Sequence, residues 1–242
     1  MANEIEKVVR LNDKQLLDYI KCPNFFNLRY LSRIPYQKPK TFHTLVNEIV
    51  EAYMIQLFNG KVMSMDKAKK LWDKQIDDYP GIVNTEKKVL EGMGLITQID
   101  RDCKMNQVLV ADVNTTYSMA FPGNAIIEGS TGIVRLNNKK FELFIPEFSQ
   151  TKPDQTLLDM SLKYTLKIYI LNKLSPDANI TNLRVYHVKS GNEYTSYRSK
   201  KDFDRLEKTI ATVAKAIRNE IFYPREDYTC PQCLYKNYCG YT

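Results

Sequence analysis

The chain has 242 residues, of which 43% are hydrophobic, and its 35 basic and 28 acidic side chains give a net charge of +7. This composition is ordinary for a globular protein, and the length allows a sizeable core. The sequence contains no apolar run of the ~18 residues that a membrane span needs, and its first residues carry an early acidic pair and no apolar segment. We therefore expect an intracellular protein, cytoplasmic or nucleoid-associated, and the basic charge favours an anionic partner, above all nucleic acid.

The first hundred residues predict mainly helices, because apolar side chains recur at helical spacing. Two short helices are expected over 11–31, with a break at Cys22-Pro23, since proline is favoured in the first turn of a helix. His43 falls in the first turn of a longer helix, where a surface or capping role and a ligand role are equally open. The longer helices are expected at 41–58, 64–78 and 84–99, the last two separated by a turn at Pro80-Gly81.

The composition changes near residue 107 to Val, Ile, Thr, Tyr and Phe, which favour strands. Turn residues at Pro122-Gly123 and Asn137-Asn138 divide this region, which predicts antiparallel strands with a hairpin. The expected order of helices, meander, crossover helix, strand and helix predicts an α/β fold with a central mixed sheet. The strands are expected at 107–112, 115–121, 125–136, 140–148, 180–188 and 194–197, and the helices at 155–173 and 200–221.

Three of the five cysteines form a C-x2-C-x5-C pattern near the end of the chain, at Cys230, Cys233 and Cys239. In a reducing compartment such a cluster indicates metal or iron–sulfur ligands rather than disulfides. A tetrahedral zinc site or an iron–sulfur cluster needs four donors, and Cys22 is the obvious fourth. The spacing leaves zinc and iron open, because both accept four sulfurs. Cys103 stands alone and is interpreted as an incidental thiol.

A resemblance to a known family lies in both ends of the sequence. The first motif is L-x4-L-x2-Y-x2-CP-x2-F-x3-Y-L, which begins at Leu11, and the second is I-x2-E-I-F-Y-P followed by C-x2-C-x5-C-G. Together they resemble the RecB-like branch of the PD-(D/E)XK nucleases, in particular the iron–sulfur-containing group that includes the CRISPR adaptation nucleases and the nuclease domain of AddB. The resemblance implies a [4Fe–4S] cluster held by Cys22, Cys230, Cys233 and Cys239, with zinc as the alternative.

The resemblance also implies a fold and a domain organisation. We expect one restriction-endonuclease-like domain over 1–242. Within it, 1–104 would form a mainly helical region that includes an insertion, 105–221 the nuclease-like core, and 222–242 a cysteine tail paired with Cys22.

The active-site positions of the family are only partly kept. His43 resembles its helical histidine ligand, and Glu147 resembles the acid of its (D/E)-x-K strand. Gly132 stands where that family has a metal-binding aspartate, and Ser149 stands where it has the lysine. Tyr169 alone is kept from the Q-x3-Y helix. The resemblance thus implies vestigial catalytic residues, with Mg²⁺ or Mn²⁺ bound only if the nuclease site still works.

Two lost groups are expected to abolish useful turnover, because one preorganised electrostatic group commonly contributes about a hundredfold to the rate. An active site could survive if Glu128 or Asp112 reached the metal and Lys152 took over the role of the lysine. DNA contacts are expected from basic side chains interleaved with tyrosines, among which Lys152, Lys163 and Lys167 are the primary candidates. The further candidates are Lys38, Lys40, Lys189, Arg198, Lys200 and Lys201.

Three functions follow from this sequence. The first is a catalytically degenerate pseudo-nuclease that binds DNA, as single strands or duplex ends, or acts as a scaffold beside protein partners in replication, recombination or repair. The second is an active Mg²⁺- or Mn²⁺-dependent DNA exonuclease with a rearranged site, and the third is a cluster-stapled protein-interaction module. We expect the first, so catalysis is not expected.

Overall fold

The protein is described by a computed structural model that covers residues 7–35, 41–79, 82, 85–105, 108–137, 139–149 and 151–240. The chain divides into two compact units. Within the described ranges, no helix is long and apolar enough to cross a membrane. Unit 1 consists of Met1–Gln37, Thr116–Ser130 and Ser199–Thr242, and unit 2 of Lys38–Thr115 and Thr131–Arg198.

Unit 1 is built on a three-stranded mixed sheet with the order β1-β4-β3. Strand β1 (Val9–Asn12) runs parallel to β4 (Ala125–Ser130), which pairs antiparallel with β3 (Thr116–Phe121). Helix α8 (Lys200–Arg218) packs against all three strands. Its buried residues recur at i, i+4, i+7 and i+8, the spacing of one helix face, and they are Leu206, Ile210, Val213 and Ala214.

Segments from the two halves of the sequence contact each other within unit 1, where the backbone N–H of Asn24 donates to the carbonyl oxygen of Tyr223 at 3.1 Å. Helix α1 (Asp13–Lys21) begins with a capping box between Asn12 and Gln15 and stops at Cys22, whose backbone is extended. Pro23 then opens α2 (Pro23–Phe26), which continues into a π-helical turn over Asn27–Leu31. The tail contains a 3₁₀ turn, Cys230–Gln232, and the short helix α9 (Lys236–Cys239). The predicted helix break at Cys22-Pro23 is confirmed.

The N-terminal part of unit 2 is a cluster of three helices. Helix α3 (Phe42–Phe58) contacts both α4 (Met65–Gln75) and α5 (Glu86–Met105), and a 3₁₀ turn, Ile76–Asp78, extends α4. Fully buried side chains from all three helices belong to one hydrophobic cluster, among them Tyr53, Trp72 and Ile96.

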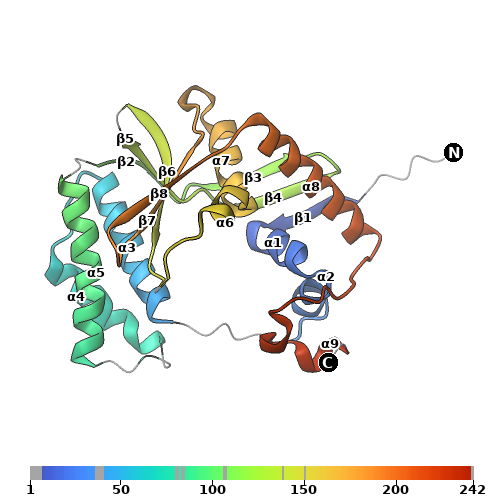
Figure 1. The fold of residues 1–242 in the computed structure, drawn as a ribbon, viewed down its shortest axis with the longest axis horizontal. Helices are drawn as coiled ribbons and strands as arrows, with labels where there is room; N and C mark the ends of the chain where they lie inside the picture. Colours follow the sequence, from blue (N-terminus) through green and yellow to red (C-terminus); the bar gives the residue numbers. More distant parts are fainter. Residues whose placement is uncertain are drawn as a thin grey trace. The chain divides into compact units, whose positions relative to one another are not determined.

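The rest of unit 2 is a five-stranded mixed sheet with the order β2-β5-β6-β7-β8. Neighbouring strands are antiparallel except for β6 and β7, which are parallel. Figure 1 shows α3 to α5 on one side of this sheet and α7 on the other. The strands are β2 (Leu109–Val113), β5 (Ile133–Asn137), β6 (Lys140–Glu147), β7 (Asn182–His187) and β8 (Asn192–Tyr197). The crossover from β6 to β7 consists of α6 (Gln155–Met160), α7 (Leu162–Leu174) and a 3₁₀ turn, Pro176–Ala178.

The predicted mixed α/β class and the helical first hundred residues are confirmed, and three expectations are corrected. The strands form two mixed sheets instead of one central sheet. The single strand expected over 125–136 is interrupted at Thr131-Gly132, because Gly132 has a φ of +106° and leaves the extended conformation. The helix expected over 155–173 is interrupted at Ser161. The single domain over 1–242 stays a prediction.

Some expectations fall partly or wholly on residues outside the described ranges. They are the turn at Pro80-Gly81, the second residue of the Asn137-Asn138 turn, the start of the strand at residue 107, and the phosphate-contact candidates Lys38 and Lys40.

Candidate functional site

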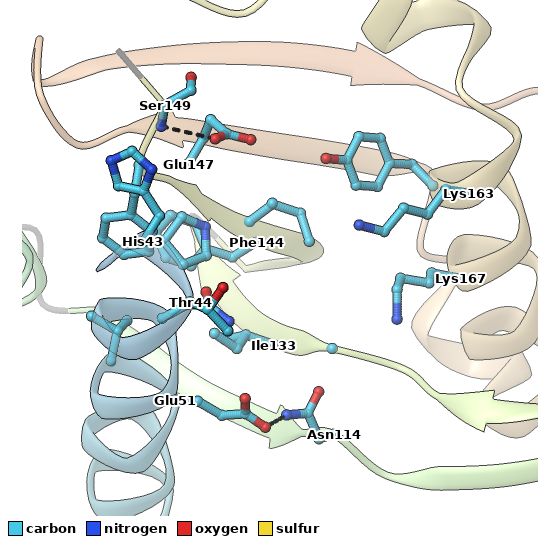
Figure 2. A pocket seen from close by; sticks show the side chains of 17 residues that line it. His43, Thr44, Glu51, Asn114, Ile133, Phe144, Glu147, Ser149, Lys163 and Lys167 are labelled. Carbon is cyan, nitrogen blue, oxygen red and sulfur yellow. Dashed lines mark hydrogen bonds between the residues drawn. The ribbon is translucent and has the colours of Figure 1, made fainter. Parts of the chain in front are cut away.

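A pocket of about 450 Å³ lies in unit 2 at the end of β6. Its walls come from α3, from β6 and the residues after it, from α7, and from the positions next to β2 and β5 (Figure 2). Two of the sequence-predicted catalytic positions, His43 and Glu147, line it together with Gly132 and Ser149. The structure therefore gathers the four positions that the family resemblance aligned with the histidine, the two acids and the lysine.

Helix α3 contributes one continuous face to the pocket. The helix begins at Thr41, whose hydroxyl accepts a hydrogen bond from the backbone N–H of Thr44, and this places His43 in the first turn. His43, Asn47 and Glu51 are four residues apart in sequence, so they lie on the same side of the helix. Sequence reasoning missed Glu51, although its spacing from His43 carried the signal.

Glu51 is linked through Asn114 to Gly132, the position that the resemblance aligns with a metal-binding aspartate. The carboxylate of Glu51 accepts a hydrogen bond from the side-chain amide of Asn114 (Figure 2). The backbone N–H of Asn114 donates to the carbonyl oxygen of Gly132 at 2.8 Å. These two bonds join α3, the residue after β2 and the residue before β5 into one wall of the pocket.

Glu147 is the last residue of β6, and its carboxylate is held by the turn that follows. Its Oε1 accepts a hydrogen bond from the backbone N–H of Ser149 at 3.0 Å (Figure 2). The hydroxyl of Ser149 donates to the carbonyl oxygen of Thr151 at 2.6 Å. The backbone N–H of Ser149 thus binds Glu147. Its hydroxyl, which stands at the position that the resemblance aligns with the lysine, is bonded to the backbone of Thr151.

His187, the last residue of β7, contacts the backbone of the turn that follows β6. Its side chain is buried, with Nε2 at 3.0 Å from the carbonyl oxygen of Ser149 and Nδ1 at 2.8 Å from the hydroxyl of Ser190. Because β6 and β7 are paired in register at Glu147 and His187, the histidine reaches the residues just beyond β6. Sequence reasoning missed His187, whose only signal was a polar side chain inside a predicted strand.

The Gly132 position does not suit an aspartate in this backbone. Its φ of +106° is a conformation that side chains other than glycine rarely adopt. A Cβ built there would lie 3.3 Å from Cδ1 of Leu143 and 4.0 Å from Cδ of Lys167. The side chain of Lys167 therefore runs past the place where an aspartate side chain would begin.

Helix α7 contributes two lysines to the pocket, Lys163 and Lys167, which lie one turn apart on the same face (Figure 2). Lys167 is only 9% exposed, whereas Lys163 is exposed, with its Nζ 5.5 Å from the ring centroid of Tyr164. Burial, reinforced by the nearby carboxylate of Glu147, raises the pKa of Tyr164. Tyr164 and Glu147 both line the pocket.

Tyr169 and Lys152, two further predicted site residues, do not line this pocket. Tyr169 is buried on α7, with Nζ of Lys173 5.3 Å from its ring centroid, and Lys152 is exposed after β6.

Asp112 and Glu128, the two carboxylates expected as alternative metal ligands, do not line the pocket either. Asp112 accepts hydrogen bonds from the hydroxyls of Thr115 and Thr131. Glu128 belongs to unit 1, where it pairs with Arg10 at 3.1 Å and accepts from Ser118.

Among the further phosphate-contact candidates, Arg198 is buried and donates to the hydroxyl of Thr165 and the carbonyl oxygen of Leu158, so it does not present its charge at the surface. The remaining candidates within the described ranges are exposed, namely Lys189, Lys200 and Lys201.

The pocket does not hold a ready-made metal site. Throughout the part of the chain that the structure describes, no group of three or more His, Cys, Asp or Glu side chains could hold a metal ion. His43, Glu51 and Glu147 share the pocket but do not converge as three ligands. Binding of Mg²⁺ or Mn²⁺ at this site stays a prediction.

The four predicted cluster cysteines all lie in unit 1, and all are half-buried thiols. Sγ of Cys22 accepts a hydrogen bond from the backbone N–H of Arg225 at 3.5 Å, and Sγ of Cys230 lies 3.8 Å from the carbonyl oxygen of the same residue. Sγ of Cys239 accepts from the side-chain amide of Asn24 at 3.2 Å. Cys22 and Cys230 thus share Arg225 as a neighbour. Four thiols are the donors that an iron–sulfur cluster needs, although among the described residues no three of them already form a binding group.

Comparison with known proteins identifies the family of this chain. No curated protein matches the chain. Among solved structures, the crystal structure of SSO0001 matches with a TM-score of 0.43 and 12% sequence identity, over 98% of this chain and 89% of that chain. A family model described as the PD-(D/E)XK nuclease superfamily matches residues 10–240, nearly the whole sequence. The chain belongs to the PD-(D/E)XK nuclease superfamily.

Proposed function

We propose that this protein binds DNA without cutting it and serves as a DNA-binding or scaffolding subunit in replication, recombination or repair. The observation that supports this function is the composition of the pocket, which has His43 and Glu147 beside glycine and serine at the other two aligned positions. One imidazole and one carboxylate would bind a divalent cation weakly. A serine hydroxyl also cannot supply the positive charge of a lysine to the transition state.

A nuclease assay tests the catalytic half of the proposal. Purified protein is incubated with single-stranded and duplex DNA in Mg²⁺ and in Mn²⁺, and products are followed by gel electrophoresis. We expect no cleavage above the level of a Glu147→Gln, His43→Ala double variant. Robust cleavage by the wild type that disappears in this double variant would overturn the proposal.

Salt-dependent DNA affinity tests the binding half. A protein that contacts several phosphates releases counterions, so its affinity falls steeply as the salt concentration rises. We expect this behaviour for single-stranded DNA or duplex ends. Absence of binding, or a Kd insensitive to ionic strength, would instead favour a module that binds only proteins.

An active nuclease with a rearranged site is the second candidate, and Glu51 is the observation that favours it. This carboxylate lines the same pocket as His43 and Glu147, and Lys163 or Lys167 could replace the missing lysine. In that case Glu51→Gln would abolish metal-dependent cleavage. Asp73→Asn, which changes an exposed carboxylate on α4, serves as the control.

The cysteines support a [4Fe–4S] cluster as part of the proposal, and with it the RecB-like iron–sulfur branch of the superfamily. The supporting contacts are the shared neighbours of Cys22 and Cys230 at Arg225 and the amide donor at Cys239. Hydrogen bonds of this kind to sulfur are typical of cluster ligands.

Metal analysis of anaerobically purified protein tests the cluster. We expect a brown protein with iron and acid-labile sulfide, which Cys22→Ser loses and Cys103→Ser keeps. Colourless protein with stoichiometric zinc in four-sulfur coordination would identify the alternative metal and rule out the cluster.

A further inference from the structure

The side chain of Lys167 passes beside the point from which a side chain at position 132 would extend. Its Cδ is 4.0 Å from the position of a Cβ built on Gly132, and the whole residue is only 9% exposed. A lysine buried to this degree packs its aliphatic chain against neighbouring residues, while its charged end usually stays toward water, and Lys167 lines the pocket. Lys167 is therefore a constituent of the pocket wall.

The ammonium group of Lys167 can be compared by net charge with an aspartate that holds a divalent cation. An aspartate together with the divalent cation that it binds carries one net positive charge. The ammonium group of Lys167 carries the same charge without any ion. A lysine beside a glycine can thus present the same net charge to a phosphate as an aspartate–metal pair does, although a single ammonium lacks the coordination that activates a nucleophile.

The pocket also contains two acids, Glu51 and Glu147, whose carboxylates accept hydrogen bonds, and a second lysine, Lys163. The carboxylate of Glu51 accepts a hydrogen bond from Asn114, and that of Glu147 accepts one from the backbone of Ser149. Lys163, one turn before Lys167, lies over the ring of Tyr164 at the exposed side of the pocket. His43 completes the set of titratable groups on the α3 side.

From this arrangement we infer that the pocket binds a phosphate of a DNA strand directly on the ammonium groups of Lys163 and Lys167, with no divalent cation. The inference rests on the proposed DNA-binding function and names the group by which the DNA is held. Lys167 binds the phosphate inside the pocket, and Lys163 binds it from the exposed rim. The site selects phosphate esters by charge, so it does not depend on base sequence.

DNA-binding measurements with and without metal test this inference. A fluorescent single-stranded oligonucleotide is titrated with full-length protein in EDTA and in Mg²⁺, over a range of salt concentrations. We expect the wild type to bind at least as tightly in EDTA as in Mg²⁺, and inorganic phosphate to compete. Lys167→Met, which keeps the aliphatic chain, should weaken binding about tenfold and reduce the salt slope by about one contact.

Matched variants control for folding and for general loss of charge. Lys173→Met removes a lysine from the same helix outside the pocket and should bind DNA like the wild type. If Lys167→Met does not fold, as judged by circular dichroism and thermal melting, Lys163→Met replaces it, because that side chain is exposed. Lys163→Met should likewise weaken binding in EDTA while Lys173→Met does not.

The outcomes separate this inference from the function on which it rests. DNA binding that requires Mg²⁺, or that is unchanged in both Lys167→Met and Lys163→Met, would overturn the phosphate site while DNA binding itself stands. No binding of DNA by the wild type under any condition would overturn the proposed function as well.

Discussion

At the scale of single residues, the backbone at Gly132, the position that the resemblance aligns with a metal-binding aspartate, does not suit a larger side chain. Its φ of +106° and the proximity of Leu143 leave no relaxed conformation for a larger side chain. The residue type at position 132 is therefore restricted by the backbone conformation between β4 and β5 and by the neighbouring side chain of Leu143. Restoring the residue type should not restore the site.

The Gly132→Asp variant tests this argument. We expect no metal-dependent cleavage and a decrease in the free energy of unfolding of about 1–3 kcal/mol, the usual cost of a disfavoured φ/ψ conformation. Urea unfolding and the nuclease assay provide the two measurements. Gly132→Ala, which imposes the same backbone strain without a charge, should lose a similar amount. Metal-dependent cleavage by Gly132→Asp at unchanged stability would contradict the explanation.

Cys103 differs from the other four cysteines in its surroundings. It is buried in unit 2, and burial raises the pKa of its thiol to about 11. Since the thiolate is the reactive form, a raised pKa means less thiolate at neutral pH. This supports its interpretation as an incidental thiol and sets its reactivity apart from that of the cluster candidates.

Alkylation followed by mass spectrometry checks the reactivity of Cys103. At pH 7 in iron-free native protein we expect it to react much more slowly than Cys230 or Cys239, and its rate should rise as the pH approaches 11. The sign follows from the raised pKa, because the folded protein favours the neutral thiol up to that pH. Rapid labelling at pH 7 without denaturant would show that Cys103 is accessible and ionised.

At the scale of elements, the packing of α4 against α5 depends on one glycine. A Cβ built on Gly92 would lie 2.3 Å from Cζ3 of Trp72, whose side chain is fully buried. The helix tolerates a glycine here because the indole of the neighbouring helix fills the space. A second glycine, Gly94, has nothing within 4 Å of its built Cβ.

This pair of glycines provides a matched prediction. Gly92→Ala should lower the free energy of unfolding by about 1–3 kcal/mol, because the methyl group overpacks the core against Trp72. Gly94→Ala should raise it by about 0.5–1 kcal/mol, because alanine has the higher helix propensity and meets no neighbour. Thermal or urea unfolding measures both. Equal effects of the two variants would show that the helices are not packed as described.

At the scale of the whole molecule, the two proposed sites belong to different units. All four cluster candidates lie in unit 1, while the phosphate pocket lies in unit 2. A cluster held by Cys22 and the tail would cross-link the two ends of the chain within unit 1. Its removal should therefore affect one unit more than the other.

Hydrogen exchange measured by mass spectrometry checks this expectation. After iron is removed with a chelator, we expect faster exchange in 22–31 and 222–240, because metal binding and folding are coupled in such segments. The strands β5 to β7 should keep their protection. Uniform loss of protection in both units, or no change near the cysteines, would contradict the assignment of the cluster to unit 1.

The sequence by itself determined most of the elements and the family. Helical spacing predicted α3, α4 and α8 with approximately correct ends, and the turn at Pro122-Gly123 predicted the β3–β4 hairpin. Helical spacing also predicted α5, but ended that helix at 99, six residues before Met105. The resemblance to the PD-(D/E)XK superfamily is confirmed. His43 and Glu147, which local motifs singled out, both line the pocket. Such features depend on residues close in sequence, which is the information that periodicity and motifs contain.

Only the tertiary structure decided which distant residues share a site. It separated β4 from β5 into different sheets, set Lys167 beside Gly132, and added Glu51 and His187 to the surroundings of Glu147. Lys167 and Gly132 lie 35 positions apart, on a helix and next to a strand, and no local pattern joins them. Their proximity follows from how α7 packs on the sheet, because burial constrains which faces of two elements meet and sequence spacing does not.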